Sequence, residues 1–169
     1  MTIRLRRART SDVRAIRALI DHYADDRILL SKATVTLYED VQEFWVAEES
    51  NSDSSVVVGC GALHVMWEDL AEVRTLAVDP ARHGQGIGSL LLSRVLDTAR
   101  ELGVARVFTL TFRTDFFARH GFVSIDGTPV SSSVYEQLLR SYDEGIAEFL
   151  ELERVKPNTL GNTRMLCYL

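Results

Sequence analysis

A glycine-rich stretch in the middle of the chain has the residues and spacing of an anion-binding loop. Residues 76–78 have β-type side chains, and Asp79-Pro80 after them is a typical strand end. Gly84, Gly86 and Gly88 follow at every second position, directly before a long helical pattern. Glycines allow backbone N–H groups to converge, and the start of a helix has unpaired amides with the positive end of the helix dipole behind them. The stretch therefore predicts a phosphate or pyrophosphate site.

Two common phosphate loops fit this stretch poorly. No Gly-Lys-Ser or Gly-Lys-Thr closes it, which argues against a P-loop. A dinucleotide fold would carry its glycines after the first strand, with an acidic residue about 20 positions further on. Here the loop comes after several predicted strands. A glycine-rich turn with no ligand is the remaining alternative.

Residues that suggest other chemistry are few. Cys60 and Cys167 lack metal-ligand spacing, and no His, Cys or Asp cluster has it, so we expect no metal and no disulfide. His64 lies in an apolar strand pattern, where a hydrogen-bonded core histidine is the more frequent case. His120 is expected at a helix end, before Gly121.

Apolar periodicity predicts the elements that must position the loop. Strands are expected over residues 2–9, 43–49, 56–67, 70–78, 106–112, 122–125 and 165–169. Helices are expected after a cap at Thr10 or Ser11, over residues 36–41, 88–102 and 114–120, and over most of 131–152. Residues 24–34 read as a loop, and residues 51–55 as a hairpin turn.

This order of elements predicts the fold class. Four strands precede the glycine loop, and a strand–helix–strand unit includes it, which is typical of an α+β fold of three-layer type with a mixed central sheet. No internal repeat and no linker is evident, so one domain over residues 1–169 is expected.

Composition limits the class of protein further. The 169 residues are 46% apolar and 25% charged, as in ordinary soluble domains. A net charge of −5 argues against a general nucleic-acid binder, and no apolar run is long enough for a membrane span. The absence of a disulfide pattern favours the cytoplasm. Arginines crowd the N-terminus; a solvated strand and helix face is the simpler interpretation, and a nucleic-acid or targeting role is the alternative.

The loop resembles the acetyl-CoA loop of the GNAT acetyltransferases, whose pattern is Arg/Gln-x-x-Gly-x-Gly/Ala. The matching segment runs from His83 to Gly88, with His83 at the Arg or Gln position and Arg82 one place earlier. The order of elements is also similar along nearly the whole chain. The resemblance implies the GNAT acyl-CoA N-acyltransferase fold with acetyl-CoA as cosubstrate. It implies cofactor contacts from Leu76, Ala77, Val78, His83, Gly84, Gln85, Gly86, Ile87, Gly88 and Ser89.

The same resemblance implies the catalytic groups. Several GNAT enzymes use a glutamate four residues before the position of Leu76 as general base, and Glu72 occupies that place. Strand alternation would put Glu72, Arg74 and Leu76 on one face, so an ion pair with Arg74 is the alternative role of Glu72. The backbone amide of Leu76 is expected to stabilise the thioester oxygen, where its strand splays from its neighbour.

The residue at the position of the family's general acid differs from the family pattern. The usual general acid is a tyrosine four residues before the Gly-Phe pair, and Phe117 stands there instead. A phenyl ring cannot protonate a thiolate, so the acid must be another group or solvent. Tyr135 and Tyr142 are candidates, although amphipathic packing is the simpler explanation of either residue.

A narrower resemblance concerns the acceptor. Residues 41–46, 59–63, 108–113, 116–122 and 156–166 are similar to the N-acetylglutamate synthases, above all to their short form. This implies transfer of acetyl to the α-amine of L-glutamate, the first step of arginine biosynthesis. The residues do not distinguish L-glutamate from L-glutamine as the acceptor. The substrate carboxylates would be bound by Lys32, Arg74, Arg113 or Arg164, because arginine suits bidentate carboxylate binding.

Several expectations go with that resemblance. The longer synthases carry a kinase-like domain in front that holds an arginine feedback site, and we expect neither that domain nor its hexamer in this chain. A homodimer is expected, with a small-molecule substrate and with neither nucleic acid nor membrane as partner. The alternatives are another GNAT acetyltransferase, acting on a protein N-terminus or an antibiotic, and a non-catalytic acyl-CoA sensor.

Overall fold

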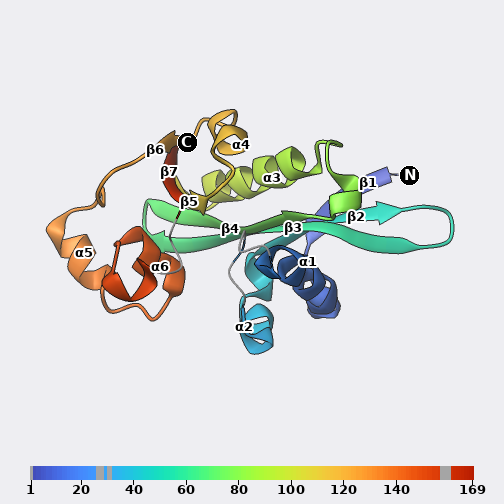
Figure 1. The fold of residues 1–169 in the computed structure, drawn as a ribbon, viewed down its shortest axis with the longest axis horizontal. Coiled ribbons are helices and arrows are strands. Elements are labelled where there is room, and N and C mark those ends of the chain that lie inside the picture. The colour runs from blue at the N-terminus through green and yellow to red at the C-terminus, as the bar shows by residue number, and fades with distance from the viewer. Residues whose placement is uncertain (1, 26–28, 30–31, 157–160) are drawn as a thin grey trace. The chain divides into compact units, whose positions relative to one another are not determined.

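A computed structural model describes residues 2–25, 29, 32–156 and 161–169. The strands are β1 Thr2–Arg7, β2 Phe44–Ser50, β3 Ser55–Trp67, β4 Leu70–Val78, β5 Arg106–Thr111, β6 Val123–Ser124 and β7 Thr163–Tyr168. The helices are α1 Val13–Asp25, α2 Thr34–Glu39, α3 Ile87–Glu101, α4 Thr114–Ala118, α5 Ser132–Leu138 and α6 Glu144–Phe149 (Figure 1). None of these described helices has both the length and the apolar character that a bilayer crossing requires.

The seven strands form one mixed sheet in the order β1-β2-β3-β4-β5-β7-β6. β4 and β5 run parallel, because helix α3 connects them, whereas the β1–β2, β2–β3, β5–β7 and β6–β7 pairs are antiparallel. The ladder between β4 and β5 is short and ends at Glu72 opposite Phe108. The sequence predicts such a mixed sheet, with the glycine loop between its parallel strands.

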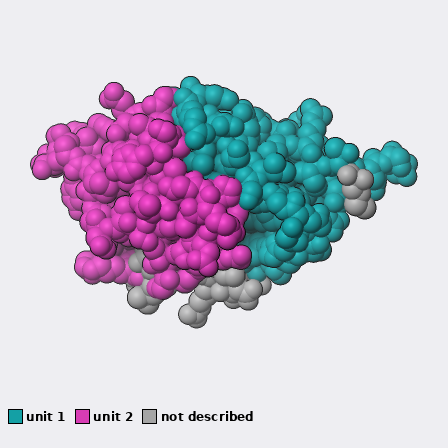
Figure 2. Space-filling model, turned by 90° about the horizontal axis from the view of Figure 1, so that it is seen from above, with its two compact units in different colours: residues 1–64, 73–102 teal, residues 65–72, 103–169 magenta. Residues whose placement is uncertain are grey.

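The chain divides into two compact units, coloured separately in Figure 2. Unit 1 contains residues 1–64 and 73–102, and unit 2 contains residues 65–72 and 103–169. Strands β3 and β4 contribute residues to both units. Each unit has its own apolar core.

The core of unit 1 has two parts. Helices α1 and α2 pack on one side of the strands through Ile16, Ile20 and Leu37, together with Phe44 and Val46 of β2. Helix α3 packs through Ile87 and Leu91 against Val58 of β3 and Leu76 of β4. Figure 1 shows α3 on one face of these strands and α1 with α2 on the other. The period-3.6 stripe of α3 is therefore the buried one.

The core of unit 2 gathers around Phe108. This β5 side chain is fully buried and meets Phe149 of α6 edge to face, with ring centroids 5.2 Å apart. Leu138 of α5, Ile146 of α6 and Leu166 of β7 complete the cluster. The region expected to be mostly helical over residues 131–152 consists of α5 and α6, with Ser131 and Asp143 as their N-caps.

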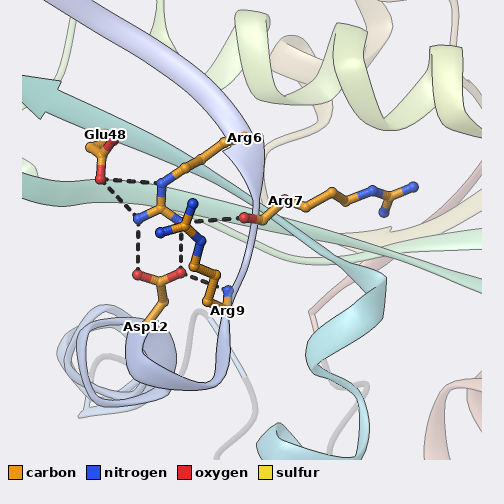
Figure 3. Close-up of polar contacts among 5 residues, drawn as sticks. All are labelled: Arg6, Arg7, Arg9, Asp12 and Glu48. Carbon is orange, nitrogen blue, oxygen red and sulfur yellow. Dashed lines mark hydrogen bonds and ion pairs between the residues drawn. The ribbon is translucent and has the colours of Figure 1, made fainter.

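The start of α1 differs from the expectation of a Thr10 or Ser11 cap. Residues Thr10–Asp12 form a 3₁₀ turn before the helix, and the Asp12 carboxylate accepts the Arg9 N–H at 2.7 Å. Arg6 donates to the same carboxylate and to Glu48 (Figure 3). An acidic side chain therefore caps this turn, because Arg6 holds it in place. The first strand also ends at Arg7, two residues earlier than predicted.

Candidate active site

The glycine loop has the conformation that its sequence predicts. Strand β4 ends at Val78, and the Asp79 carboxylate accepts the Ala81 N–H at 2.9 Å, which starts the 3₁₀ turn Pro80–Arg82. Gly84 and Gly86 then have φ of 78° and 80°, in the left-handed region that favours glycine. Gly86 is the N-cap of α3, one residue before the helix begins at Ile87.

The space above the loop is open, and the helix end behind it suits an anion. A Cβ added at Gly84 or Gly86 would meet no heavy atom within 4 Å. The first turn of α3 contains no acidic residue, and no side chain caps the helix. Its first amides therefore present the positive end of a 15-residue helix dipole. These features fit the pyrophosphate of acetyl-CoA.

The two basic residues before the loop have different partners. The Arg82 guanidinium donates two hydrogen bonds to the Glu49 carboxylate of β2, with Nε 2.9 Å from Oε1 and Nη2 2.6 Å from Oε2. This pair raises the pKa of Arg82 and lowers that of Glu49. His83 is exposed and lies beside Tyr23 of α1, with Nε2 2.6 Å from the hydroxyl. Of the two, His83 is therefore the better placed for a ligand phosphate.

Glu72 is a buried carboxylate of unit 2. Only 4% of it is exposed, and its register partner on β5 is Phe108. A carboxylate buried to this extent is unusual and needs a structural or a catalytic reason.

Strand β4 is irregular directly before Leu76, the residue expected to supply the oxyanion-binding amide. Thr75 has φ of 56°, and its carbonyl accepts from the buried Cys60 thiol at 3.5 Å. Regular side-chain alternation stops at such a residue. Strand geometry alone therefore does not place Glu72, Arg74 and Leu76 on one face, and that expectation stays a prediction. The Leu76 side chain packs with the α3 cluster.

Two of the four predicted substrate cations lie in one charged cluster of unit 1. Burial raises the pKa of Asp40, the Glu43 carboxylate raises it further, and the charges of Lys32, Arg74 and His64 oppose this. His64 Nδ1 lies 2.6 Å from Glu43 Oε1, so this histidine is hydrogen-bonded as expected, although it is only half-buried. The sequence prediction missed Asp40 and Glu43, because acidic residues around a short helix are usually solvated.

The other two predicted cations, Arg113 and Arg164, belong to unit 2 and differ in their surroundings. Arg113 is exposed at the start of α4, and its guanidinium has no hydrogen bond or ion pair among the described residues. Arg164 is half-buried, lies over the Phe108 ring and donates to the carbonyls of Gly127 and Phe149. Arg113 is therefore available to a ligand, whereas Arg164 is already engaged.

The candidates for the general acid are also placed. Phe117 is buried between Phe116 and Phe122, with ring centroids 5.2 and 5.1 Å away. It is thus a core residue of unit 2. Tyr142 is 98% exposed, and Tyr135 packs against the unit 2 core. Neither environment singles out one tyrosine as a proton donor.

Thiol and metal chemistry find little support in the described part of the chain. Burial raises the pKa of the Cys60 thiol to about 12, so a Cys60 thiolate is not formed near neutral pH. Among the described residues, no group of three or more His, Cys, Asp or Glu side chains could hold a metal ion.

The fold and the loop together define an acetyl-CoA-dependent acetyltransferase. Residues 12–122 match the family described as "Acetyltransferase (GNAT) family", and the chain belongs to that family. Among its relatives, the amino-acid acetyltransferase of Mycobacterium tuberculosis is 61% identical over 165 residues, which cover 98% of this chain and 94% of that protein. The identification made from the sequence is therefore confirmed.

Solved structures extend the comparison. The crystal structure of Rv2747 from Mycobacterium tuberculosis in complex with CoA and NLQ has a TM-score of 0.94 at 61% identity, covering 98% of this chain and 99% of that one. The N-acetylglutamate synthase of Neisseria gonorrhoeae, complexed with coenzyme A and N-acetyl-glutamate, has a TM-score of 0.77 at 24% identity. That second likeness is one of fold, and this chain matches only 35% of that structure.

Proposed function

We propose that this acetyltransferase transfers the acetyl group of acetyl-CoA to the α-amine of L-glutamate or L-glutamine, as in the first step of arginine biosynthesis. The observation that supports this most is the nearly full-length likeness to an amino-acid acetyltransferase, together with the open glycine loop. In this reaction the amine nitrogen attacks the thioester carbonyl, the amine loses a proton, and the C–S bond breaks to give the N-acetyl amino acid and CoA thiol.

The cosubstrate would lie against residues 76–89. The backbone of Leu76, Ala77 and Val78 would line the arm of acetyl-CoA. The amides of the loop and of the α3 start would bind the pyrophosphate, as the positive φ of Gly84 and Gly86 supports. Gln85, Ile87, Gly88 and Ser89 complete the proposed loop contacts.

Glu72 is the proposed general base. An ammonium group must lose a proton before it can attack, and a carboxylate can accept that proton directly or through one water. The burial of Glu72 supports this role, because a carboxylate is seldom buried without a structural or a functional reason.

The Leu76 amide is the proposed stabiliser of the thioester oxygen. An N–H aimed at a developing oxyanion acts without reorganisation. The left-handed Thr75 supports this role, because an irregular residue re-aims the amide that follows it.

Four cations remain candidates for the acceptor's carboxylates, with unequal support. The exposed and unengaged Arg113 is the strongest. Lys32 and Arg74 follow, because the charges of both act on the carboxylate of Asp40, which puts both in one region of unit 1. Arg164 is the weakest, since backbone carbonyls already accept from its guanidinium.

The experiment that tests this function is release of CoA thiol from acetyl-CoA, with each free amino acid offered separately as acceptor. We expect release with glutamate or glutamine, and the N-acetyl product identified by mass spectrometry. If CoA thiol is released only with amine antibiotics or with N-terminal peptides, the proposed amino-acid acceptor is wrong and that class of amine takes its place. Binding of acetyl-CoA without release from any acceptor would favour a non-catalytic acyl-CoA sensor instead.

Two further features belong to the proposal. A homodimer is proposed, and sedimentation equilibrium tests it. Location in the cytoplasm is proposed from the absence of a disulfide pattern in the sequence, and cell fractionation tests that location.

A further inference from the structure

A tyrosine near the end of α1 connects the last residue of β4 to the glycine loop. The Tyr23 hydroxyl donates to the Val78 carbonyl and lies 2.6 Å from His83 Nε2. The two rings are stacked, with centroids 6.2 Å apart and planes 20° apart. All three residues belong to unit 1. From the sequence, Tyr23 is only one apolar position of a helical stripe.

The hydrogen bonds decide which ring nitrogen of His83 carries its proton. A phenol has one O–H, and the Val78 carbonyl can only accept, so this proton goes to Val78. The Tyr23 oxygen must then accept from His83, which places the histidine proton on Nε2. Neutral His83 therefore has a lone pair at Nδ1, and only the cationic ring has a second N–H there to offer to an anion.

The charged and titratable neighbours of His83 have other partners, which leaves His83 as the residue that can donate to an anion. Arg82 is held by Glu49, and Asp79 caps the turn before the loop. His22 of α1 meets Tyr23 edge to face, with centroids 5.1 Å apart. Among the described residues, these are the charged and titratable groups that the contacts next to His83 identify, and directly after it come Gly84 and the open loop.

We propose that Tyr23 is a positioning residue for the cosubstrate: its oxygen accepts from His83 Nε2–H in both protonation states and so orients the ring, and the cationic form then donates its second N–H, at Nδ1, to a phosphate of acetyl-CoA. The inference rests on the proposed cosubstrate loop. It predicts that acetyl-CoA binds more tightly when His83 is cationic, and therefore at lower pH.

The test is calorimetric titration of acetyl-CoA into the wild type, Tyr23→Phe, His83→Arg and the double variant, between pH 5.5 and 8.5. Tyr23→Phe keeps the ring and removes only the hydroxyl. Arginine occupies the position of His83 in the family pattern and keeps its charge throughout, so its N–H donors do not change with pH. The phosphate of the ligand also titrates, with a second pKa of about 6, and it does so equally for every protein. The affinity of His83→Arg at each pH therefore serves as the reference for this effect. His22→Gln controls for the neighbouring histidine.

We expect wild-type affinity, relative to His83→Arg, to fall at least threefold from pH 5.5 to 8.5. Tyr23→Phe should weaken binding at least threefold and flatten this dependence, yet change affinity less than twofold in the His83→Arg background. Equal weakening in both backgrounds would make Tyr23 a packing residue and overturn the inference. The inference would also be overturned if His22→Gln removed the pH dependence of acetyl-CoA affinity. It would be overturned as well if wild-type affinity stayed in a constant ratio to that of His83→Arg at every pH. Failure of every protein to bind acetyl-CoA would instead overturn the proposed loop.

Discussion

The guanidinium of Arg6 and the carboxylate of Asp12 form a two-point ion pair, with Nη1–Oδ2 at 2.7 Å and Nη2–Oδ1 at 3.0 Å. The same guanidinium reaches Glu48 of β2, so one arginine joins β1, β2 and the start of α1 (Figure 3). At least this member of the N-terminal arginine group is structural.

The Arg6–Asp12 pair makes stability depend on pH in a defined direction. Hydrogen bonds from Arg6 hold the pKa of Asp12 below its usual value. A lowered folded-state pKa stabilises the protein above the unfolded value of about 3.9, and this contribution is lost as pH falls through the folded-state value. Asp12→Asn should therefore lower the free energy of unfolding by about 1–3 kcal/mol at pH 7.

Urea denaturation at pH 7 and at steps down to pH 3 measures this effect. The difference between wild type and Asp12→Asn should shrink below about pH 4. Asp21→Asn, which removes an exposed carboxylate from the same region, is the control and should cost little. A constant difference across the whole range would mean that the loss in Asp12→Asn is one of packing.

Gly86→Val should lower acetyl-CoA affinity at least tenfold, about 1.4 kcal/mol. The new side chain would point into the open space above the loop, where the pyrophosphate is proposed to lie. A β-branched residue at φ of 80° also strains the backbone by roughly 1–2 kcal/mol. Gly103→Val is the matched control, because Gly103 has φ of 83° and equally open space but follows the other end of α3. Both variants should lose similar stability, and calorimetry should find unchanged affinity only in Gly103→Val.

Glu72→Gln should lower kcat by about 10²–10⁴-fold, the usual contribution of a general base. The rate should recover partly at high pH, where more of the acceptor is free amine. Glu68→Gln makes the same chemical change in an exposed turn four residues earlier and should be nearly silent. A Glu72→Gln enzyme that stays within about twofold of the wild type from pH 6 to 9 would assign Glu72 to the structure.

Arg113→Ala should lower kcat/KM for glutamate or glutamine by roughly 30-fold to several thousandfold, because the loss leaves a carboxylate unpaired. Arg113→Lys should restore only part, since an ammonium lacks the two-point geometry of a guanidinium. Arg119→Ala, at an exposed arginine just after α4, is the control and should change little. Affinity for acetyl-CoA should hold in all three proteins. If it falls together with turnover, Arg113 supports the cosubstrate site or the fold.

Residues 1–169 are expected to unfold as one domain, although they form two compact units, because one sheet contains strands of both. The two tryptophans report on the units separately: Trp45 lies in unit 1 and Trp67 in unit 2. In Trp67→Phe and in Trp45→Phe, the remaining fluorescence and the far-UV circular dichroism should give one common urea midpoint. Separate midpoints for the two signals in either variant would mean that the units unfold independently.

Local patterns were sufficient to predict most elements from the sequence. The apolar stripe of α3, the strand before the loop and the polar turn at residues 51–55 each have a signal within a few residues, and all three are present. The glycine loop was predictable for the same reason, since the left-handed backbone at Gly84 and Gly86 favours glycine. The glycine loop and the order of these elements together identified the family.

Contacts between distant segments required the tertiary structure. Tyr23 and His83 are 60 residues apart, and Arg6 and Glu48 are 42 apart, so no local pattern could pair them. The break at Thr75 is a backbone conformation that β-branched residues rarely adopt, and the fold imposes it against local preference. The sequence determined which residue types were available for chemistry. The fold alone decided that Arg113 is open to a ligand while Arg164 is engaged by carbonyls, because burial and hydrogen bonding depend on what the rest of the chain brings to each side chain.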